Sequence, residues 1–277
     1  RGSRLFPVTQ GISKQLLPIY DKPMIYYSLS ILMLSGIRDI LIICNKENLD
    51  AFQRLLENGA KLGINIEYSI QDQPRGIADA FIVGEKFIGN DSVCLILGDN
   101  IFWGGGLTTL LDEASELENG ARIFSYQVKD PENFGVINYD ENNRVISIEE
   151  KPINPSSNSI ATGLYYYDNQ VIDIAKNVKP SKRGEIEITS VNHEYLSNNE
   201  LKVTPLGRGF VWFDTGTVKN LYQASNFVET IQNSNGQLVA SLEEIALNKN
   251  WITKEDLERI ITSYKNTEYA KSLKEIL

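Results

Sequence analysis

The feature that constrains the fold most is an alternation of two apolar patterns in the first third of the chain. Residues 39–44 and 92–97 are continuous apolar runs, typical of strands that are covered on both faces. Residues 64–70 alternate as a half-buried strand does. Between these segments, residues 48–62 and 77–87 carry apolar side chains at helical spacing. Strand, helix, strand, helix and strand with short connections predict an α/β fold, with a Rossmann-like doubly wound mixed sheet and helices on both faces.

Further elements are expected on both sides of this segment. A helix is predicted from Lys22 to Gly36, with Pro23 in its first turn and Gly36 past its end. Apolar residues at helical spacing continue from Thr217 onward, so the tail is expected to be mostly helical. The intervening segments predict strands at 121–128, 135–139, 145–149 and 161–167, and helices at 170–178 and 187–196. No linker or internal repeat interrupts the chain, which therefore predicts a single domain over residues 1–277.

Charge and composition exclude several classes of protein. The chain has 277 residues, and 27 Lys and Arg stand against 36 Asp and Glu, a net charge of −9. A general nucleic-acid binder needs an excess of basic residues, so none is expected here. No apolar run reaches the length of about 18 residues that a membrane helix requires. Cys44 and Cys94 lie in apolar runs, which favours reduced core thiols and a cytoplasmic protein.

The first candidate for chemistry lies near the start of the chain. Gly2 and Ser3 are followed by two spaced cations, Arg4 and Lys14. Small residues whose backbone N–H groups are accessible, together with basic side chains, suit a cradle for phosphate. The alternative is an ordinary Gly-Ser turn with two exposed basic residues. This segment by itself leaves both interpretations open.

Two carboxylates form the second candidate. Asp99 follows the buried strand at 92–97, and Asp214 follows an aromatic segment. Ligands of open parallel sheets bind at the carboxyl ends of strands, so both positions suit a metal ion, although each Asp could instead cap the next helix. Two carboxylates together with Arg4 and Lys14 are the set that a Mg²⁺-dependent phosphoryl or nucleotidyl transfer requires.

The ordered motifs resemble a known family. Gly2-Ser-Arg-Leu-Phe-Pro-Val-Thr, the segment from Lys14 to Tyr27, Leu97-Gly-Asp-Asn, Glu149-Glu-Lys-Pro and Trp212 to Gly216 are similar to motifs of the sugar-nucleotide pyrophosphorylases. Within that family, the chain looks most like the thymidylyltransferases that act on glucose 1-phosphate. The resemblance covers nearly the whole sequence.

The resemblance implies a reaction, a cofactor and partners. Members convert dTTP and α-D-glucose 1-phosphate into dTDP-glucose and pyrophosphate, the first step toward dTDP-rhamnose and related deoxysugars, with Mg²⁺. They are usually homotetramers built as a dimer of dimers, and they bind neither nucleic acid nor membranes. Residues 1–120 would form the nucleotide-binding half, 121–216 the sugar-phosphate-binding half, and 217–277 a helical tail for subunit contacts or regulation.

Matching positions give roles to individual residues. Arg4 and Lys14 would be the catalytic cations that contact the leaving pyrophosphate, and Asp99 and Asp214 would hold the metal. The nucleotide would be bound by Gly2, Gln71, Gly76 and Asp99. The sugar phosphate would be bound by Leu97, Gly135, Glu150, Lys151, Thr162, Arg183 and Trp212. No protein nucleophile is required, because the sugar phosphate is itself an anionic oxygen nucleophile.

Simpler interpretations remain for some of these residues. The Glu-Glu-Lys run at 149–151 could be a solvated surface, and Trp212 could be a core residue. One base-reading Gln does not exclude UTP, CTP or GTP in place of dTTP, or a different hexose phosphate. A regulatory homologue that binds sugar nucleotides without turnover is a further alternative, although Lys14, Asp99 and Asp214 are all present.

The sequence departs from the family pattern at its start and at two positions. The family normally begins with a strand that leads into its Gly-rich loop, whereas here the sequence starts inside that loop. We therefore expect the native protein to be longer, and the sheet described here to have an open edge. Ser3 stands where Thr is usual, and Ser190 stands where Asp is usual.

Overall fold

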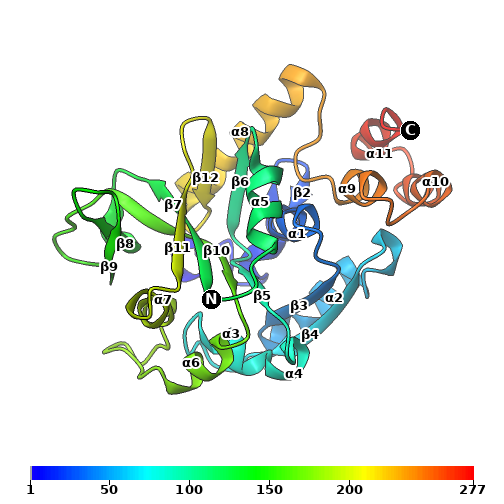
Figure 1. Ribbon diagram of the computed structural model, residues 1–277. Helices are drawn as coiled ribbons and strands as arrows, with labels where there is room; N and C mark the ends of the chain where they lie inside the picture. The colour runs from blue at the N-terminus through cyan, green and yellow to red at the C-terminus, as the bar shows by residue number, and fades with distance from the viewer. Residues whose placement is uncertain (1) are drawn as a thin grey trace.

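Two strand systems lie side by side in the computed structural model, which describes residues 2–277 (Figure 1). In the first, β3 (Asp39–Cys44) pairs in parallel with β4 (Asn65–Ile70), and α2 (Leu49–Leu56) lies in the connection between them. In the second, the strand order is β11-β7-β10-β8-β9, and β5 (Val93–Ile96) pairs with β10. The fold is therefore the expected α/β type with a mixed sheet, since β11 pairs in parallel with β7 and the other pairs of the second system are antiparallel.

The remaining elements complete the two systems. The other strands of the larger sheet are β7 (Ala121–Gln127), β8 (Gly135–Tyr139), β9 (Val145–Glu150), β10 (Ser159–Tyr167) and β11 (Leu201–Pro205). Two separate ribbons are formed by β1 (Pro18–Ile19) with β2 (Lys22–Pro23), and by β6 (Asn100–Gly104) with β12 (Phe210–Asp214). The further helices are α1 (Ile25–Leu34), α3 (Asp79–Val83), α4 (Glu85–Ile88), α5 (Leu107–Ser115), α6 (Val171–Asn177), α7 (Ile188–Ser197), α8 (Val218–Asn235), α9 (Leu242–Asn248), α10 (Lys254–Ser263) and α11 (Glu268–Lys274).

Several predicted helices are shorter than expected, each for a local reason. The helix expected at 48–62 ends at Leu56, because Glu57 and Gly59 adopt positive φ angles of 51° and 78°. The helix expected at 77–87 is divided at Gly84 into α3 and α4. Pro23 belongs to β2 and precedes α1, so its predicted place in the first helical turn was wrong. β6, α5 and β11 were not predicted at all.

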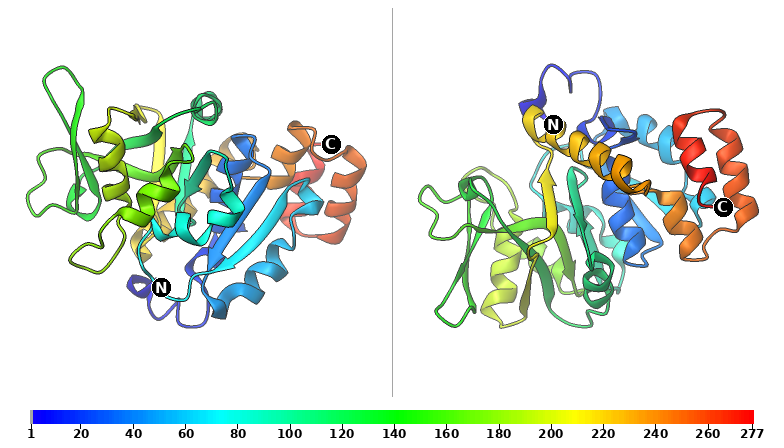
Figure 2. Two further views of the ribbon diagram at one scale, coloured as in Figure 1. Left: turned by 60° about the horizontal axis from the view of Figure 1, so that its bottom comes forward. Right: turned by 90° about the horizontal axis from the view of Figure 1, so that it is seen from above.

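The helical tail shares its core with the first strand system. Leu242, Leu257 and Leu273 are fully buried against side chains of α1 and β3 such as Met33 and Ile40. Figure 2 shows α9 to α11, in orange and red, gathered beside α1 and α2. The predicted apolar face of α8 is confirmed, because it packs on residues of the first 30 positions through Leu221, Ala224, Phe227, Val228 and Ile231. No described helix is both long and apolar enough to span a membrane.

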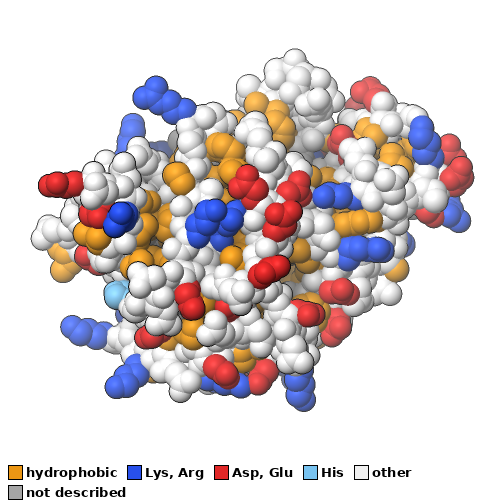
Figure 3. Space-filling view, in the orientation of Figure 1, with side chains coloured by type: hydrophobic (Ala, Val, Ile, Leu, Met, Phe, Trp, Pro, Cys, Tyr) orange, Lys and Arg blue, Asp and Glu red, His pale blue; other side chains and the backbone are white. Residues whose placement is uncertain are grey.

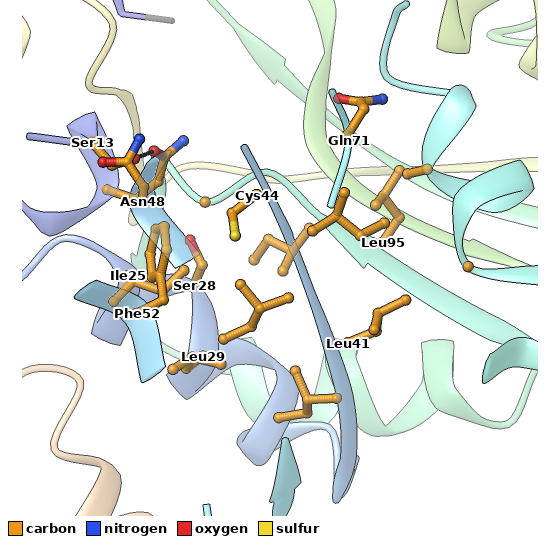
Figure 4. Close-up of a pocket in the computed structure, with 18 of the residues that line it drawn as sticks. Ser13, Ile25, Ser28, Leu29, Leu41, Cys44, Asn48, Phe52, Gln71 and Leu95 are labelled. Carbon is orange, nitrogen blue, oxygen red and sulfur yellow. Dashed lines mark hydrogen bonds between the residues drawn. The ribbon is translucent and has the colours of Figure 1, made fainter. Parts of the chain in front are cut away.

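A cavity of about 1050 Å³ separates the two systems between β3 and β5. Leu41, Phe52 and Leu95 are among the apolar side chains that line it, and Ser13, Asn48 and Gln71 are among the polar ones (Figure 4). Within the described residues β3 pairs only with β4, and β5 only with β10. Lys14 and Gln71 lie at the polar end of the same cavity.

Surface charge agrees with the composition. On the face shown in Figure 3, Lys and Arg side chains are scattered among acidic ones and do not gather into a continuous basic surface. Nucleic-acid binders usually present such a surface.

Candidate active site

The loop that carries Gly2 folds back onto Lys14. Gly2 has a φ of +63°, and its carbonyl accepts hydrogen bonds from the Thr9 hydroxyl at 2.8 Å and the Leu5 backbone N–H at 2.9 Å. A Cβ at position 2 would lie 3.3 Å from the Cβ of Lys14. Glycine suits this position for both reasons, because L side chains rarely adopt such a φ and the neighbouring lysine leaves little space.

Four charged residues from three separate segments meet beyond this loop. Asp99 lies in the turn between β5 and β6, and Asp214 ends β12, the strand that pairs with β6. Lys14 forms an ion pair with Oδ2 of Asp99, and Nη2 of Arg4 lies 3.9 Å from Oδ2 of Asp214. The side chains of Lys14, Asp99 and Asp214 are only 12%, 16% and 17% exposed. The structure therefore brings together the two cations and two carboxylates singled out in the sequence.

Asp214 shows the electrostatic character of this cluster. Burial, followed by the charge of Asp99, raises the pKa of Asp214 above its usual value of 3.8, against the opposing effects of Lys14 and Arg4. A bound cation would relieve the repulsion between the two carboxylates, so the pair suits a hard divalent metal. Among residues 2–277 no third His, Cys, Asp or Glu joins them.

Two residues that the sequence analysis did not single out hold Asp99 in place. The Nδ2 of Asn100 donates to Oδ1 of Asp99 at 3.0 Å. Thr215 donates to the Asp99 carbonyl twice, from its backbone N–H at 3.0 Å and from its hydroxyl at 2.8 Å. Asn100 directly follows Asp99 in the sequence, and Thr215 directly follows Asp214. This adjacency is the one sequence feature from which their role could have been predicted.

Trp212 lies in the core and supports the same carboxylate indirectly. It is 8% exposed, and its ring packs edge-on against Phe134 with centroids 5.5 Å apart. Its Nε1 donates to Oδ1 of Asn100 at 2.7 Å, and the backbone N–H of Gly163 donates to the same oxygen at 3.0 Å. Trp212 is therefore a core residue, which is one of the two interpretations that the sequence left open.

Gln71 and Gly76 belong to the loop between β4 and α3. The Nε2 of Gln71, directly after β4, donates to Oδ2 of the buried Asp79 at 2.7 Å. Gly76 has a φ of +112°, and a Cβ there would lie 2.3 Å from the carbonyl oxygen of Ile186. Ile186 also makes backbone hydrogen bonds with Arg75 and Ala78. The loop is therefore docked against the segment that carries Arg183.

Charges on the sugar-phosphate side gather around Glu150. Nη2 of Arg183 lies 3.2 Å and Nζ of Lys151 lies 3.3 Å from Oε1 of Glu150. The Thr189 hydroxyl donates to Oε2 of Glu150 at 2.5 Å. Gly135 is the strand partner of Glu150, and a Cβ there would lie 3.1 Å from the Thr189 hydroxyl. Arg183 and Lys151 are 44% and 45% exposed, so solvent screens their ion pairs more than the pair of Lys14 and Asp99. We call Arg4, Lys14, Asp99 and Asp214 the Lys14 cluster, and Glu150, Lys151 and Arg183 the Glu150 cluster.

Leu97 and Thr162 lie in the framework beside the site. Leu97 pairs its backbone N–H with the Gly163 carbonyl at 2.9 Å, and its carbonyl accepts from the Ser28 hydroxyl at 3.0 Å. Thr162 is 1% exposed, and its hydroxyl donates to the Phe124 carbonyl at 3.1 Å.

Tyr165 is a buried residue of β10. Burial, then the charges of Glu150 and Asp99, raise the pKa of its hydroxyl.

Comparisons with known proteins agree on one family. A family profile for nucleotidyl transferases matches residues 1–231. Glucose-1-phosphate thymidylyltransferase from Neisseria meningitidis is 52% identical over 276 residues, which cover 100% of this chain and 96% of that protein. The enzyme of the same name from Mycobacterium tuberculosis is 49% identical with the same coverage. A solved structure from Bacillus anthracis, assigned as a glucose-1-phosphate thymidylyltransferase, superimposes with a TM-score of 0.75 at 39% identity, covering 82% of this chain and 90% of that one.

Proposed function

The chain belongs to the nucleotidyl transferase family and, within it, to the glucose-1-phosphate thymidylyltransferases, and we propose that its Lys14 cluster catalyses their reaction. In that reaction a thymidylyl group passes from dTTP to α-D-glucose 1-phosphate. A phosphate oxygen of glucose 1-phosphate attacks the α-phosphorus of dTTP. The bond from that phosphorus to the bridging oxygen breaks, and pyrophosphate leaves with the electron pair. The products are dTDP-glucose and pyrophosphate.

Two pairs of cations would contact different phosphates, those of the leaving pyrophosphate and that of glucose 1-phosphate. Arg4 and Lys14 would offset the charge that grows on the leaving pyrophosphate. Arg183 and Lys151 would hold the phosphate of the sugar, and Glu150 would accept hydrogen bonds from glucose hydroxyls. With both substrates oriented and neutralised, the in-line reaction requires no protein nucleophile.

Members of this family generally use a divalent metal, and we propose Mg²⁺ held by Asp99 and Asp214. Mg²⁺ favours one or two carboxylates supplemented by substrate phosphates and water, which matches the two-carboxylate set. When bound, the ion would supply charge neutralisation at the transferred phosphate. The position of the two carboxylates supports this assignment, because both are largely buried and the charge of Asp99 contributes to the raised pKa of Asp214.

The base would be read beside the cavity. Gln71 lines the cavity, and Gly76 lies five positions further along the same loop. A side-chain amide and nearby backbone groups can match the hydrogen-bonding edge of thymine. Gly2, beside Lys14, would allow the triphosphate to approach the backbone.

We also propose a division of labour along the chain and an assembly. Residues 1–120 would bind the nucleotide, 121–216 the sugar phosphate, and 217–277 would contribute to subunit contacts in a homotetramer. The protein would act in the cytoplasm, and its free thiols Cys44 and Cys94 suit a reducing compartment.

The observation that carries the proposal is the meeting of Arg4, Lys14, Asp99 and Asp214 from distant segments. The test is pyrophosphate release from purified protein with each pairing of dTTP, UTP, CTP or GTP with hexose 1-phosphates. We expect the highest kcat/KM with dTTP and glucose 1-phosphate, and dependence on Mg²⁺. Equal or faster turnover of UTP would overturn the choice of nucleotide. Nucleotide binding without any pyrophosphate release would overturn the enzymatic assignment.

A further inference from the structure

Asp79 is a buried carboxylate beside the proposed base site that the proposed reaction does not use. It is 0% exposed and lies at the start of α3, eight positions after Gln71. Its Oδ2 accepts from Nε2 of Gln71 at 2.7 Å and from Nε of Arg75 at 3.3 Å. Nη2 of Arg75 also lies 3.0 Å from Oδ1. A charged group this deeply buried is costly unless it is paired, and the Arg75 guanidinium supplies the pairing.

The contact with Asp79 decides which end of the Gln71 amide is available. Ionised carboxylates only accept hydrogen bonds, so the amide must turn its nitrogen toward Asp79. No described group donates to the Gln71 amide oxygen. Figure 4 shows that oxygen pointing toward the side of the cavity where Ser13 lies, with the nitrogen on the opposite side. The reverse orientation would place two acceptor oxygens against each other without a proton between them.

This orientation distinguishes between pyrimidines. Thymine and uracil have an N–H at N3, from which the amide oxygen can accept. The carbonyl next to it can accept from the second N–H of the amide, since only one N–H is used by Asp79. Cytosine has an acceptor at N3 next to an amino group, so the same pose would require the reversed amide. An unpaired acceptor at a buried site is penalised strongly.

We propose that Asp79 is a positioning residue that fixes the Gln71 amide and thereby selects nucleotides with an N3–H over cytosine nucleotides. The inference rests on the proposed function, because it needs Gln71 to meet the base. It goes beyond that function in assigning the preference to a residue that does not touch the substrate. Asp79 gives no discrimination between thymine and uracil, which share the N3–H.

The test compares dTTP with dCTP in Asp79→Asn, which keeps the shape of the side chain but can both donate and accept. We expect the ratio of kcat/KM for dTTP to that for dCTP to fall about tenfold or more. The change should lie in KM for each nucleotide, with kcat at saturating dTTP nearly unchanged, since the reacting groups are untouched. Asp79→Ser provides the same comparison if the Asn variant does not fold. An unchanged ratio in a folded variant would overturn the proposal.

A double-mutant cycle separates positioning from a general structural effect. In a Gln71→Ala background, Asp79→Asn should change the nucleotide ratio by less than about twofold, because its effect passes through Gln71. An equal fall in that background would refute the mechanism. Asp168→Asn is the matched control: Asp168 is also buried, and it accepts from the Gly120 N–H at 2.6 Å and the Tyr195 hydroxyl at 2.7 Å. It should lower the melting temperature without moving the ratio.

Equilibrium binding of dTTP and dCTP, measured by calorimetry, keeps this inference separate from the proposed function. If the wild-type protein binds dTTP more tightly than dCTP but releases no pyrophosphate, the proposed reaction fails while the selectivity of the Asp79 variants still tests the positioning role. If it turns over dTTP and the variants keep the wild-type selectivity, only the positioning role fails.

Discussion

The Lys14 cluster (Arg4, Lys14, Asp99 and Asp214) and the Glu150 cluster (Glu150, Lys151 and Arg183) contain the same kinds of side chain in different surroundings. In the first, three of four side chains are less than one fifth exposed. In the second, both cations are nearly half exposed. Burial and a like charge raise the pKa of Asp214, whereas the second cluster lies where water screens its ion pairs.

This difference in burial is consistent with two roles toward a bound phosphate, stabilisation of charge during reaction and binding in the ground state. Desolvated charges act strongly on one another, so a small set of fixed groups can stabilise a charge that develops during reaction. Exposed charges contribute orientation and affinity while adapting to the ligand. We therefore assign the larger share of rate acceleration to the Lys14 cluster and the larger share of sugar-phosphate affinity to the Glu150 cluster.

Removing a carboxylate from the Lys14 cluster should have the largest effect. We expect Asp99→Ala and Asp214→Ala each to lower kcat by on the order of 10³-fold, because each would remove a ligand of the proposed metal and the carboxylate that pairs with a neighbouring cation. Pyrophosphate release at saturating substrates measures the loss, and circular dichroism checks that the fold is retained. Near-normal Mg²⁺-dependent rates in either variant would exclude that residue as a metal ligand.

Removing a cation from the Glu150 cluster should have a smaller and different effect. Arg183→Gln is expected to raise KM for glucose 1-phosphate about tenfold, the loss of one charge-assisted hydrogen bond, with little change in KM for dTTP. Steady-state kinetics with each substrate varied in turn provide the measurement. A matching rise in both KM values would show that the two clusters are not divided as we propose. Lys151→Gln offers a neighbouring comparison.

The smallest effect concerns stability and its dependence on pH. The pKa of Asp214 is higher in the folded protein than its usual value of 3.8, which we take for the unfolded chain. The contribution of Asp214 to the free energy of unfolding is therefore complete at a pH below 3.8 and is lost as the pH rises through the folded-state pKa. Without metal at neutral pH, Asp214→Asn should therefore melt roughly 2 °C above wild type. The gap should close as the pH falls through the folded pKa of Asp214.

The matched variant for this measurement is Glu150→Gln. An exposed pair contributes about 0–1 kcal/mol at most, so this variant should shift the melting temperature little. Thermal unfolding of both variants, with and without Mg²⁺, completes the comparison. A melting temperature of Asp214→Asn below that of wild type at neutral pH without metal would contradict the electrostatic picture.

Local patterns predicted many elements well. The apolar run at 39–44 is β3, and residues 135–139 form β8, both with the expected bounds. Prediction failed where backbone conformation or long-range pairing decided the outcome. Positive φ at Glu57 ends α2 early, and β5 pairs antiparallel with the distant β10, a partner that the local pattern does not indicate. Neither event has a strong local signal, because a non-glycine residue with positive φ is uncommon and pairing depends on the whole sheet.

The sequence by itself determined the α/β class, the buried apolar strands and the chemical types available for the site. Those follow from periodicity and composition, which are properties of short segments. The tertiary structure alone decided which charges share a low-dielectric environment, that Trp212 holds Asn100 from the core, and that Asp79 faces Gln71. These contacts join elements from separate parts of the fold, and electrostatic coupling depends on distance and burial in space, which sequence order does not encode.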